Sequence, residues 1–244
     1  MATPNVYDER FEASPGYDVA NDGETVSGTA TITPDKATTG QPNWGNECLE
    51  VAAGNDEAAY YDLLYFGSLA ISYFRFEIQI VSELLGNGNI GRLISVWDHL
   101  WSEAFRLYLY QDGSGNLKFQ ISSYHDGASN AYIGFPTLST GVVYRVEIKW
   151  DATNDLWAWR IDGVDQPNDQ DATDPVESEG ILSSAHVTNV DNMAVGTWQW
   201  DNGYTAYFDL VGIDNSDWIG AEAAGSILPL VGHSLGGQCN RMTG

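Results

Sequence analysis

The sequence predicts an all-β protein, built as a sandwich or barrel of antiparallel sheets. The main observation is a period of two, because apolar and polar side chains alternate in the segments 73–80, 105–109, 117–121 and 143–150. Such alternation indicates strands with one face in the core and the other in water. Short loops rich in Asp, Asn and Gly separate these segments. Many short strands joined by such turns are typical of sandwiches and barrels.

The elements follow one another with little helical pattern between them. The predicted strands, in chain order, are 10–12, 24–32, 48–51, 73–80, 93–97, 105–109, 117–121, 143–150, 156–161, 193–200 and 204–213. Residues 111–116 and 151–155 have the composition of hairpin loops. A turn or two of helix is expected only in 55–66 and 99–105.

Composition supports a folded chain and excludes several partners. The chain has 244 residues, of which 43% are hydrophobic and 12% aromatic, unlike a disordered protein. Its net charge of −24 disfavours nucleic acid and anionic membranes as partners. No run approaches eighteen consecutive apolar residues, so no membrane span is predicted. The first residues lack the pattern of a signal peptide.

Two cysteines, Cys48 and Cys239, are too few for a disulfide framework. They could pair with each other, but free buried thiols are at least as well supported by the sequence. The pairing therefore stays open at this level.

Basic residues concentrate in the predicted strands. Six of the ten lie there: Arg75, Arg106, Lys118, Arg145, Lys149 and Arg160. This placement predicts a sheet face of mixed charge, solvated and laced with weak cross-strand ion pairs. The alternative interpretation is a ligand-binding face.

Four segments carry a resemblance to a known family: residues 144–150, 159–163, 208–214 and Phe11-Glu12. The first two look like the paired strands of concanavalin A-like and laminin-G-like domains, 208–214 like their closing strand, and Phe11-Glu12 like their opening strand. The resemblance covers roughly residues 6–220. It implies a two-sheet antiparallel jelly-roll sandwich, assigned to residues 1–220. Residues 221–244 are predicted to form a short C-terminal arm, since they are rich in small residues and Pro229 prevents a helix there.

The resemblance also implies a structural metal. Many members of the family hold Ca²⁺ near the first and last strands, where Glu12 and Asp209 lie in this chain. Both offer the hard oxygen ligands that Ca²⁺ prefers, although the sequence has no EF-hand loop. The alternative for each is a turn cap or a solvated acid.

No catalytic centre is predicted. The segment 232–236 matches the G-x-S-x-G nucleophile elbow but lacks a following helix and a later His, so we interpret it as coincidence. The Glu-x-Asp-x-Glu strand of related glycoside hydrolases is absent. Of the alginate-lyase pattern, only the Arg-x-Glu strand has a counterpart here, Arg75-Phe76-Glu77, and the likeness is superficial. His125 is interpreted as a loop residue, since no second catalytic group is placed beside it.

Two aromatic clusters are candidate glycan-binding sites. They contain Trp97 and Trp101 in the first, and Trp198, Trp200 and Tyr204 in the second. Sugar C–H faces stack on aromatic rings while sugar hydroxyls need polar partners, and both clusters border predicted loops. Core packing is the competing interpretation, above all for Trp97 and Trp198.

These observations predict a non-catalytic structural or surface protein of a virion-like assembly, with possible adhesion to glycans. Its partners would be capsid or tail proteins or further copies of itself, and it would lie on a virion surface or outside the cell. The alternative is a carbohydrate-binding module or a glycan-degrading enzyme of the same fold. Fold resemblance by itself does not choose between these functions.

Overall fold

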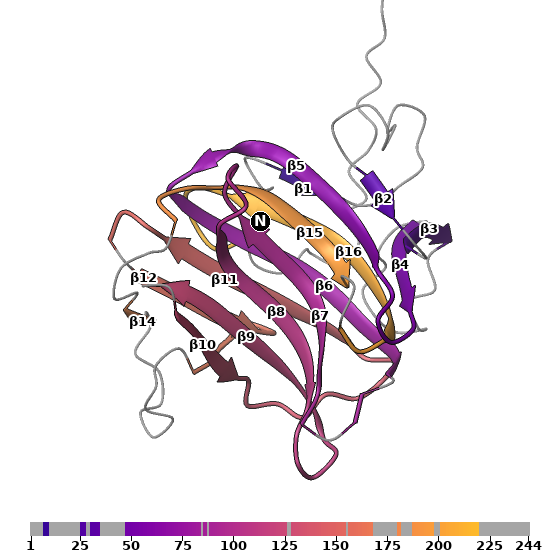
Figure 1. Cartoon of the computed structure of the whole chain (residues 1–244). Coiled ribbons are helices and arrows are strands. Elements are labelled where there is room, and N and C mark those ends of the chain that lie inside the picture. The colour runs from indigo at the N-terminus through magenta and orange to yellow at the C-terminus, as the bar shows by residue number, and fades with distance from the viewer. Residues whose placement is uncertain are drawn as a thin grey trace, which may run out of the picture.

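The computed structural model describes residues 7–9, 25–27, 30–34, 47–83, 85–86, 88–125, 128–154, 156–167, 180–181, 187–197 and 201–219. All regular elements in these residues are strands. The strands form two antiparallel sheets that lie one over the other (Figure 1). The prediction of an all-β, two-sheet antiparallel sandwich is therefore confirmed.

One sheet has nine strands. Seven follow the order β13-β12-β11-β6-β16-β4-β3, while β1 pairs with β16 and β14 pairs with β12. Their bounds are β1 (Tyr7–Glu9), β3 (Ala30–Pro34), β4 (Glu47–Ala53), β6 (Ile71–Glu83), β11 (Val143–Asp151), β12 (Leu156–Ile161), β13 (Val164–Asp165), β14 (Gly180–Ile181) and β16 (Tyr204–Asp214). The central strands β11, β6 and β16 come from distant parts of the chain, because the chain passes to the other sheet after β6, returns at β11, and passes over again for β15 before β16.

The other sheet has seven strands in the order β10-β9-β8-β7-β15-β5-β2. Their bounds are β2 (Thr25–Ser27), β5 (Ala59–Leu69), β7 (Ile90–Trp97), β8 (Glu103–Gln111), β9 (Leu117–His125), β10 (Ala128–Ile133) and β15 (Val190–Thr197). Strands β7 to β10 are consecutive hairpins, and β15 inserts between β7 and β5. This sheet carries the candidate site.

The core lies between the sheets and contains the apolar half of each alternating strand. Phe74, Phe76, Ile78 and Ile80 of β6 are all at most 1% exposed, as their spacing predicts. Phe74 meets Phe105 of the other sheet edge to face, with ring centroids 5.2 Å apart. Full burial of each such side chain contributes about 1.5–3 kcal/mol, so the alternation itself accounts for much of the stability.

The polar side chains of β6 contradict the prediction of a solvated sheet face. Arg75, Glu77 and Gln79 face away from the core, yet they are only 1%, 5% and 2% exposed. The Arg75 Nε donates a hydrogen bond to the carbonyl of Leu210 at 3.0 Å. This face is therefore a buried charge network rather than the solvated face that the sequence predicts. Buried charges need such partners, because an uncompensated one costs several kcal/mol.

Two ion pairs on this face run along a strand. The Arg145 Nε lies 3.3 Å from the Glu147 Oε2, and the Lys149 Nζ lies 3.9 Å from the Asp151 Oδ2. Residues two apart in a strand share a face, so each pair is local in sequence. The predicted cross-strand pairing is also present on this sheet, because Arg160 of β12 lies opposite Asp165 of β13 and the Arg160 Nε is 2.6 Å from the Asp165 Oδ1.

The two segments expected to hold helical turns are not helical. Residues 59–66 belong to β5, and 103–105 open β8. Strand pairing decides this, because Tyr61 of β5 lies opposite Val195 of β15 and both side chains are buried. Tertiary pairing routinely overrides a weak local preference for helix. No helix within the described ranges is long and apolar enough to cross a membrane.

Several predictions fall outside the described residues. They concern the C-terminal arm at 221–244, the domain boundary at residue 220, the motif at 232–236, Glu12 and Cys239. Cys48, which is described, is a buried cysteine.

Candidate functional site

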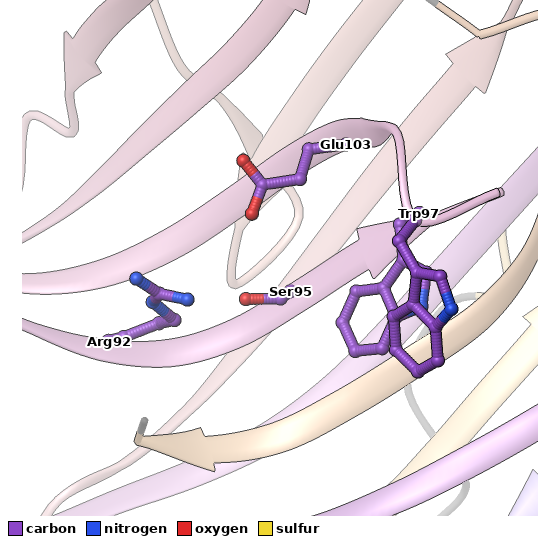
Figure 2. A pocket seen from close by; sticks show the side chains of 5 residues that line it. Arg92, Ser95, Trp97 and Glu103 are labelled. Carbon is purple, nitrogen blue, oxygen red and sulfur yellow. The ribbon is translucent and has the colours of Figure 1, made fainter. Parts of the chain in front are cut away.

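A cavity of about 170 Å³ opens on the outer face of the seven-stranded sheet. It lies on β7, on β8 and on the loop between them, and it is lined by Arg92, Ser95, Trp97, Trp101 and Glu103. Figure 2 shows the Glu103 carboxylate and the Ser95 hydroxyl extending toward the side where the Arg92 guanidinium lies, with the Trp97 indole at the far end of β7. The site thus has an aromatic end and a polar end.

A β-bulge in β7 brings the polar and aromatic ends to one face. Arg92 lies at an even position whereas Ser95 and Trp97 lie at odd positions, so a regular strand would point Arg92 the opposite way. The register between β7 and β8 shifts between Arg92 and Ile94. Leu93 is the extra residue, and its side chain is buried in the core. The bulge therefore lets Arg92 share the outer face with Ser95 and Trp97.

A second bulge does the same in β8. Trp97 lies opposite Glu103 while the preceding residue of β7 lies opposite Phe105, so Ala104 is the extra residue. Glu103 and Arg106, three positions apart, consequently occupy the same face. Their side chains pair, with the Arg106 Nε donating to the Glu103 Oε1 at 2.6 Å.

The loop of residues 98–102 holds Trp101 over Trp97. The Asp98 Oδ1 accepts hydrogen bonds from the backbone N–H groups of Leu100 and Ser102, each at 2.8 Å. The N–H of Trp101 also donates to the Asp98 carbonyl at 3.0 Å. These bonds close a compact turn that carries Trp101 at φ 65°.

The two indoles form a stacked pair. Their ring centroids are 5.3 Å apart, and their planes differ by 23°. Trp97 is 3% exposed, whereas Trp101 is 59% exposed. The buried ring supports the exposed one, which leaves an aromatic surface in solvent. For a bulky residue the left-handed backbone at Trp101 is a genuine outlier, and such strain is typical of functional sites.

Arg92 is anchored from the loop that precedes β16. Its Nε lies 3.1 Å from the Asp201 Oδ2, and both side chains are largely buried. The Tyr204 hydroxyl donates a hydrogen bond to the Arg92 carbonyl at 2.7 Å. Burial and the nearby charge of Asp201 raise the pKa of the Tyr204 hydroxyl well above its usual value, so it stays protonated and donates.

Arg106 and Glu103 form the second charge pair of the site. The Arg106 guanidinium also donates to the Tyr108 hydroxyl at 3.2 Å. Burial lowers the pKa of Arg106, but its hydrogen bonds and charge interactions with Tyr108 and Glu103 outweigh this effect and raise the pKa above the usual value. The pair is therefore a fixed positive charge matched by a carboxylate.

Ser95 supplies a hydroxyl at the floor of the cavity. The residue is 1% exposed, and its Oγ has no hydrogen-bond partner among the described residues. Its neighbour across the sheet is Ala194 of β15, whose small side chain leaves room on this face. A buried hydroxyl with open capacity suits hydrogen bonding to a ligand or to water, because buried polar groups are almost always satisfied.

A histidine and a carboxylate border the aromatic end. The Nδ1 of His99, an exposed residue, lies 3.7 Å from the Oδ2 of Asp191, a buried one. Burial raises the pKa of the Asp191 carboxyl, and the charge of Asp98 raises it further against the opposing effects of His99 and Asn192.

The predicted glycan-binding residues lie in different parts of the structure. Trp97 and Trp101 come together in the cavity. Tyr204 lies in the core at 1% exposure, where it positions Arg92 and offers no exposed ring. Trp198 and Trp200 lie outside the described residues. Sequence reasoning missed Arg92, Ser95 and Glu103, because the bulges that bring them together leave no simple pattern in the sequence.

Of the predicted metal ligands, only Asp209 is described. It is fully buried, and its Oδ1 accepts a hydrogen bond from the backbone N–H of Leu210 at 2.7 Å. It lies opposite Glu77, another buried carboxylate, in the β16–β6 register. Within the described ranges no group of three or more His, Cys, Asp or Glu side chains is placed to hold a metal ion. A Ca²⁺ on Asp209 would thus need ligands from elsewhere, such as Glu12.

Comparison with known proteins supports the fold. No protein-family model matches the chain, and no curated protein sequence is similar to it. Among solved structures, the cellulose-induced protein Cip1 is similar with a TM-score of 0.58 and 15% identity, over 88% of this chain and 100% of that one.

Two toxin domains are similar as well. The binding domain of paraclostridial mosquitocidal protein 1 has a TM-score of 0.55 and 11% identity, over 86% of this chain and 48% of that one. The binding domain of botulinum neurotoxin DC, solved in complex with SialylT, has a TM-score of 0.51 and 9% identity, over 80% of this chain and 43% of that one. At these identities the likeness establishes a jelly-roll-like sandwich.

Proposed function

We propose that this protein binds glycans without catalysing a reaction, and that its site is the cavity on β7 and β8. The observation that carries the proposal is the stacked Trp97–Trp101 pair, with an exposed ring at the edge of a cavity whose other walls are polar. Isolated exposed aromatics are common on protein surfaces. Here, by contrast, a strained turn holds the exposed ring of Trp101 against the buried ring of Trp97, so its position is fixed by the surrounding structure.

The chemistry of the site suits a sugar. A pyranose ring has C–H faces that pack on an indole and hydroxyls that need hydrogen-bond partners. Trp101 offers the face, while Ser95, Arg92 and Glu103 offer donors and acceptors on the same surface. Stacking at one end and hydrogen bonding at the other would orient a ring between them.

The absence of catalysis belongs to the same proposal. Glycoside hydrolysis uses two carboxylic groups, one of which gives a proton to the leaving oxygen. The carboxylates at the polar end of the site, Glu103 and Asp201, are each engaged by an arginine, and Asp191 at the aromatic end lies beside His99. That arrangement suits the binding of a ligand rather than the transfer of a proton to it.

The variant Trp101→Gly tests the proposal. Glycine accepts φ 65° without strain, so this change removes the ring and should keep the fold. We expect glycan binding, measured on a glycan array and then by titration calorimetry, to weaken at least tenfold, which corresponds to about 1.4 kcal/mol.

Phe135→Ala is the matched control. Phe135 is also an exposed aromatic, at 53%, but it does not line the cavity. Binding should be unchanged in this variant. Equal binding by the wild type and Trp101→Gly would contradict the proposed site, and failure of the wild type to bind any glycan would contradict the proposed function.

We also propose that the glycan site serves adhesion by a larger assembly, such as a virion surface. This second proposal rests on the acidic composition, with a net charge of −24, which suits a soluble surface component. The mass of the protein in solution, measured by light scattering, tests this second proposal.

A further inference from the structure

We propose that the cavity selects neutral saccharides and rejects acidic ones, because the arginine that lines it and the arginine beside it are both already matched by carboxylates of the protein. The inference rests on the proposed glycan-binding function and adds the class of ligand. It follows from the placement of four charged groups and from the charge of the whole chain.

The first matched arginine is Arg92. Its Nε lies 3.1 Å from the Asp201 Oδ2, and the two side chains are 16% and 10% exposed. Recognition of a uronate or sialate carboxylate generally uses an arginine in a charge-assisted, often bidentate pair. Here the protein supplies that carboxylate itself, so a ligand carboxylate would have to displace Asp201 or share the guanidinium with it.

The second matched arginine is Arg106. Its Nε and a terminal nitrogen both donate to the Glu103 Oε1. Glu103 lines the cavity, whereas Arg106 does not. An acidic ligand in the cavity would therefore meet the carboxylate before the guanidinium. Like charges at close range repel strongly where water is partly excluded.

Neutral hydroxyls can use the same groups without conflict. The guanidinium of Arg92 has five N–H donors, more than one carboxylate can accept, and Glu103 has two acceptor oxygens. The Ser95 hydroxyl can donate or accept, and it has no hydrogen-bond partner among the described residues. A sugar hydroxyl is both donor and acceptor, so it complements this mixed set better than a carboxylate does.

The field of the whole molecule acts in the same direction. The net charge of −24 repels anionic polymers at long range and slows their approach at low salt. The local charge pairs and the global charge therefore both favour a neutral ligand.

A glycan array that carries neutral, uronate-containing and sialylated structures tests the inference. We expect the wild type to bind neutral glycans only, and Glu103→Gln to gain binding to acidic glycans at least fivefold, since Arg106 would then lack its carboxylate. Asp201→Asn, which removes the partner of Arg92, is the second variant and should shift selectivity the same way. Thermal melts identify any variant that fails to fold.

Asp165→Asn is the matched control. Asp165 also pairs with an arginine, its Oδ1 lying 2.6 Å from the Arg160 Nε, but on the nine-stranded sheet. This variant changes the net charge by the same amount and should leave selectivity unchanged. Preferential binding of acidic glycans by the wild type would overturn the inference while leaving the proposed function intact. If both site variants fold and still bind only neutral glycans, the charge pairs are not the cause. Binding to nothing on the array would overturn both proposals.

Discussion

At the scale of single residues, Trp101 and Asp98 show how a short loop can hold an aromatic ring ready for a ligand. The Asp98 carboxylate accepts two backbone hydrogen bonds within the loop, and the loop carries Trp101 at φ 65°. A non-glycine residue in this conformation costs of order 1–3 kcal/mol, which the surrounding bonds must offset. A ring held in place before binding loses less conformational entropy when a ligand arrives.

Asp112 provides a prediction on pH. Its Oδ1 accepts from the N–H groups of Ser114 and Asn116, and its Oδ2 accepts from the Asn116 side chain. The Asn116 side-chain bond, then its backbone bond, lower the pKa of Asp112 below the usual 3.8. Because the folded pKa lies below the unfolded one, this stabilisation is present above the unfolded pKa and is lost as pH falls through the folded pKa.

We therefore expect Asp112→Asn to lower the Tm at pH 7 by about 1–2 °C, and this difference from the wild type to shrink as pH falls below about 4. Thermal melts followed by circular dichroism from pH 7 to pH 2.5 measure it. A difference that stays constant over that range would show that the charge of Asp112 does not stabilise the fold.

At the scale of elements, β15 sets where β7 and the cavity lie, because it pairs with β5 on one side and β7 on the other. Its contact with β5 is unusually close at Gly196. This residue has φ +123°, and an added Cβ would lie 2.3 Å from the Ala59 carbonyl oxygen and 2.7 Å from the Tyr60 Cα. Both obstacles are backbone atoms, so a side chain cannot be accommodated without moving a strand.

Gly196→Ala should consequently destabilise the protein by about 2–3 kcal/mol. Urea unfolding measures this as a lower midpoint with an unchanged m-value. Gly113→Ala is the control, since Gly113 has no atom within 4 Å of an added Cβ and no positive φ, and its midpoint should hardly move. Equal midpoints for the two variants would mean that β15 shifts freely against β5.

At the scale of the whole molecule, the nine-stranded sheet carries buried negative charge. Asp209 and Glu77 are neighbouring buried carboxylates, and they belong to a chain of net charge −24. Neighbouring buried carboxylates need positive charge close by. We propose that Ca²⁺ contributes to that charge through Asp209, together with the lysine and arginines of this face.

We expect a calcium chelator to lower the Tm by several degrees, because an ion that binds only the folded state stabilises it by mass action. Light scattering on the same samples gives the mass. An oligomer would support the assembly proposal, and a monomer would count against it. An unchanged Tm with chelator would contradict the calcium proposal.

Much of the fold could be predicted from the sequence, because a strand with one buried face must alternate. The alternation in 73–80 and 143–150 correctly placed Phe74, Ile148 and their neighbours in the core. The same rule misled for Arg75 and Glu77. It says which side of a sheet a residue faces, but not whether that side is in water.

The candidate site was only half predictable. Trp97 and Trp101 stand out in the sequence as aromatics beside a predicted loop. Tyr204 is also an aromatic beside a predicted loop, yet it lies in the core. Arg92 and Glu103 gave no signal, because two bulges change the side of the sheet on which they lie. A bulge inserts one residue into one strand of a pair, so it is a property of the pairing and cannot be seen in either strand alone.

The sequence by itself thus determined strand periodicity, the two faces of each strand, turn composition and the acidic charge of the chain. Only the tertiary structure decided which strands are neighbours, where the register shifts, and which charges meet. The pair Arg92–Asp201 illustrates the division, since its members are distant in the chain and 3.1 Å apart in space. Local pattern depends on the geometry of one strand, whereas a binding site depends on contacts that form only when distant strands pack.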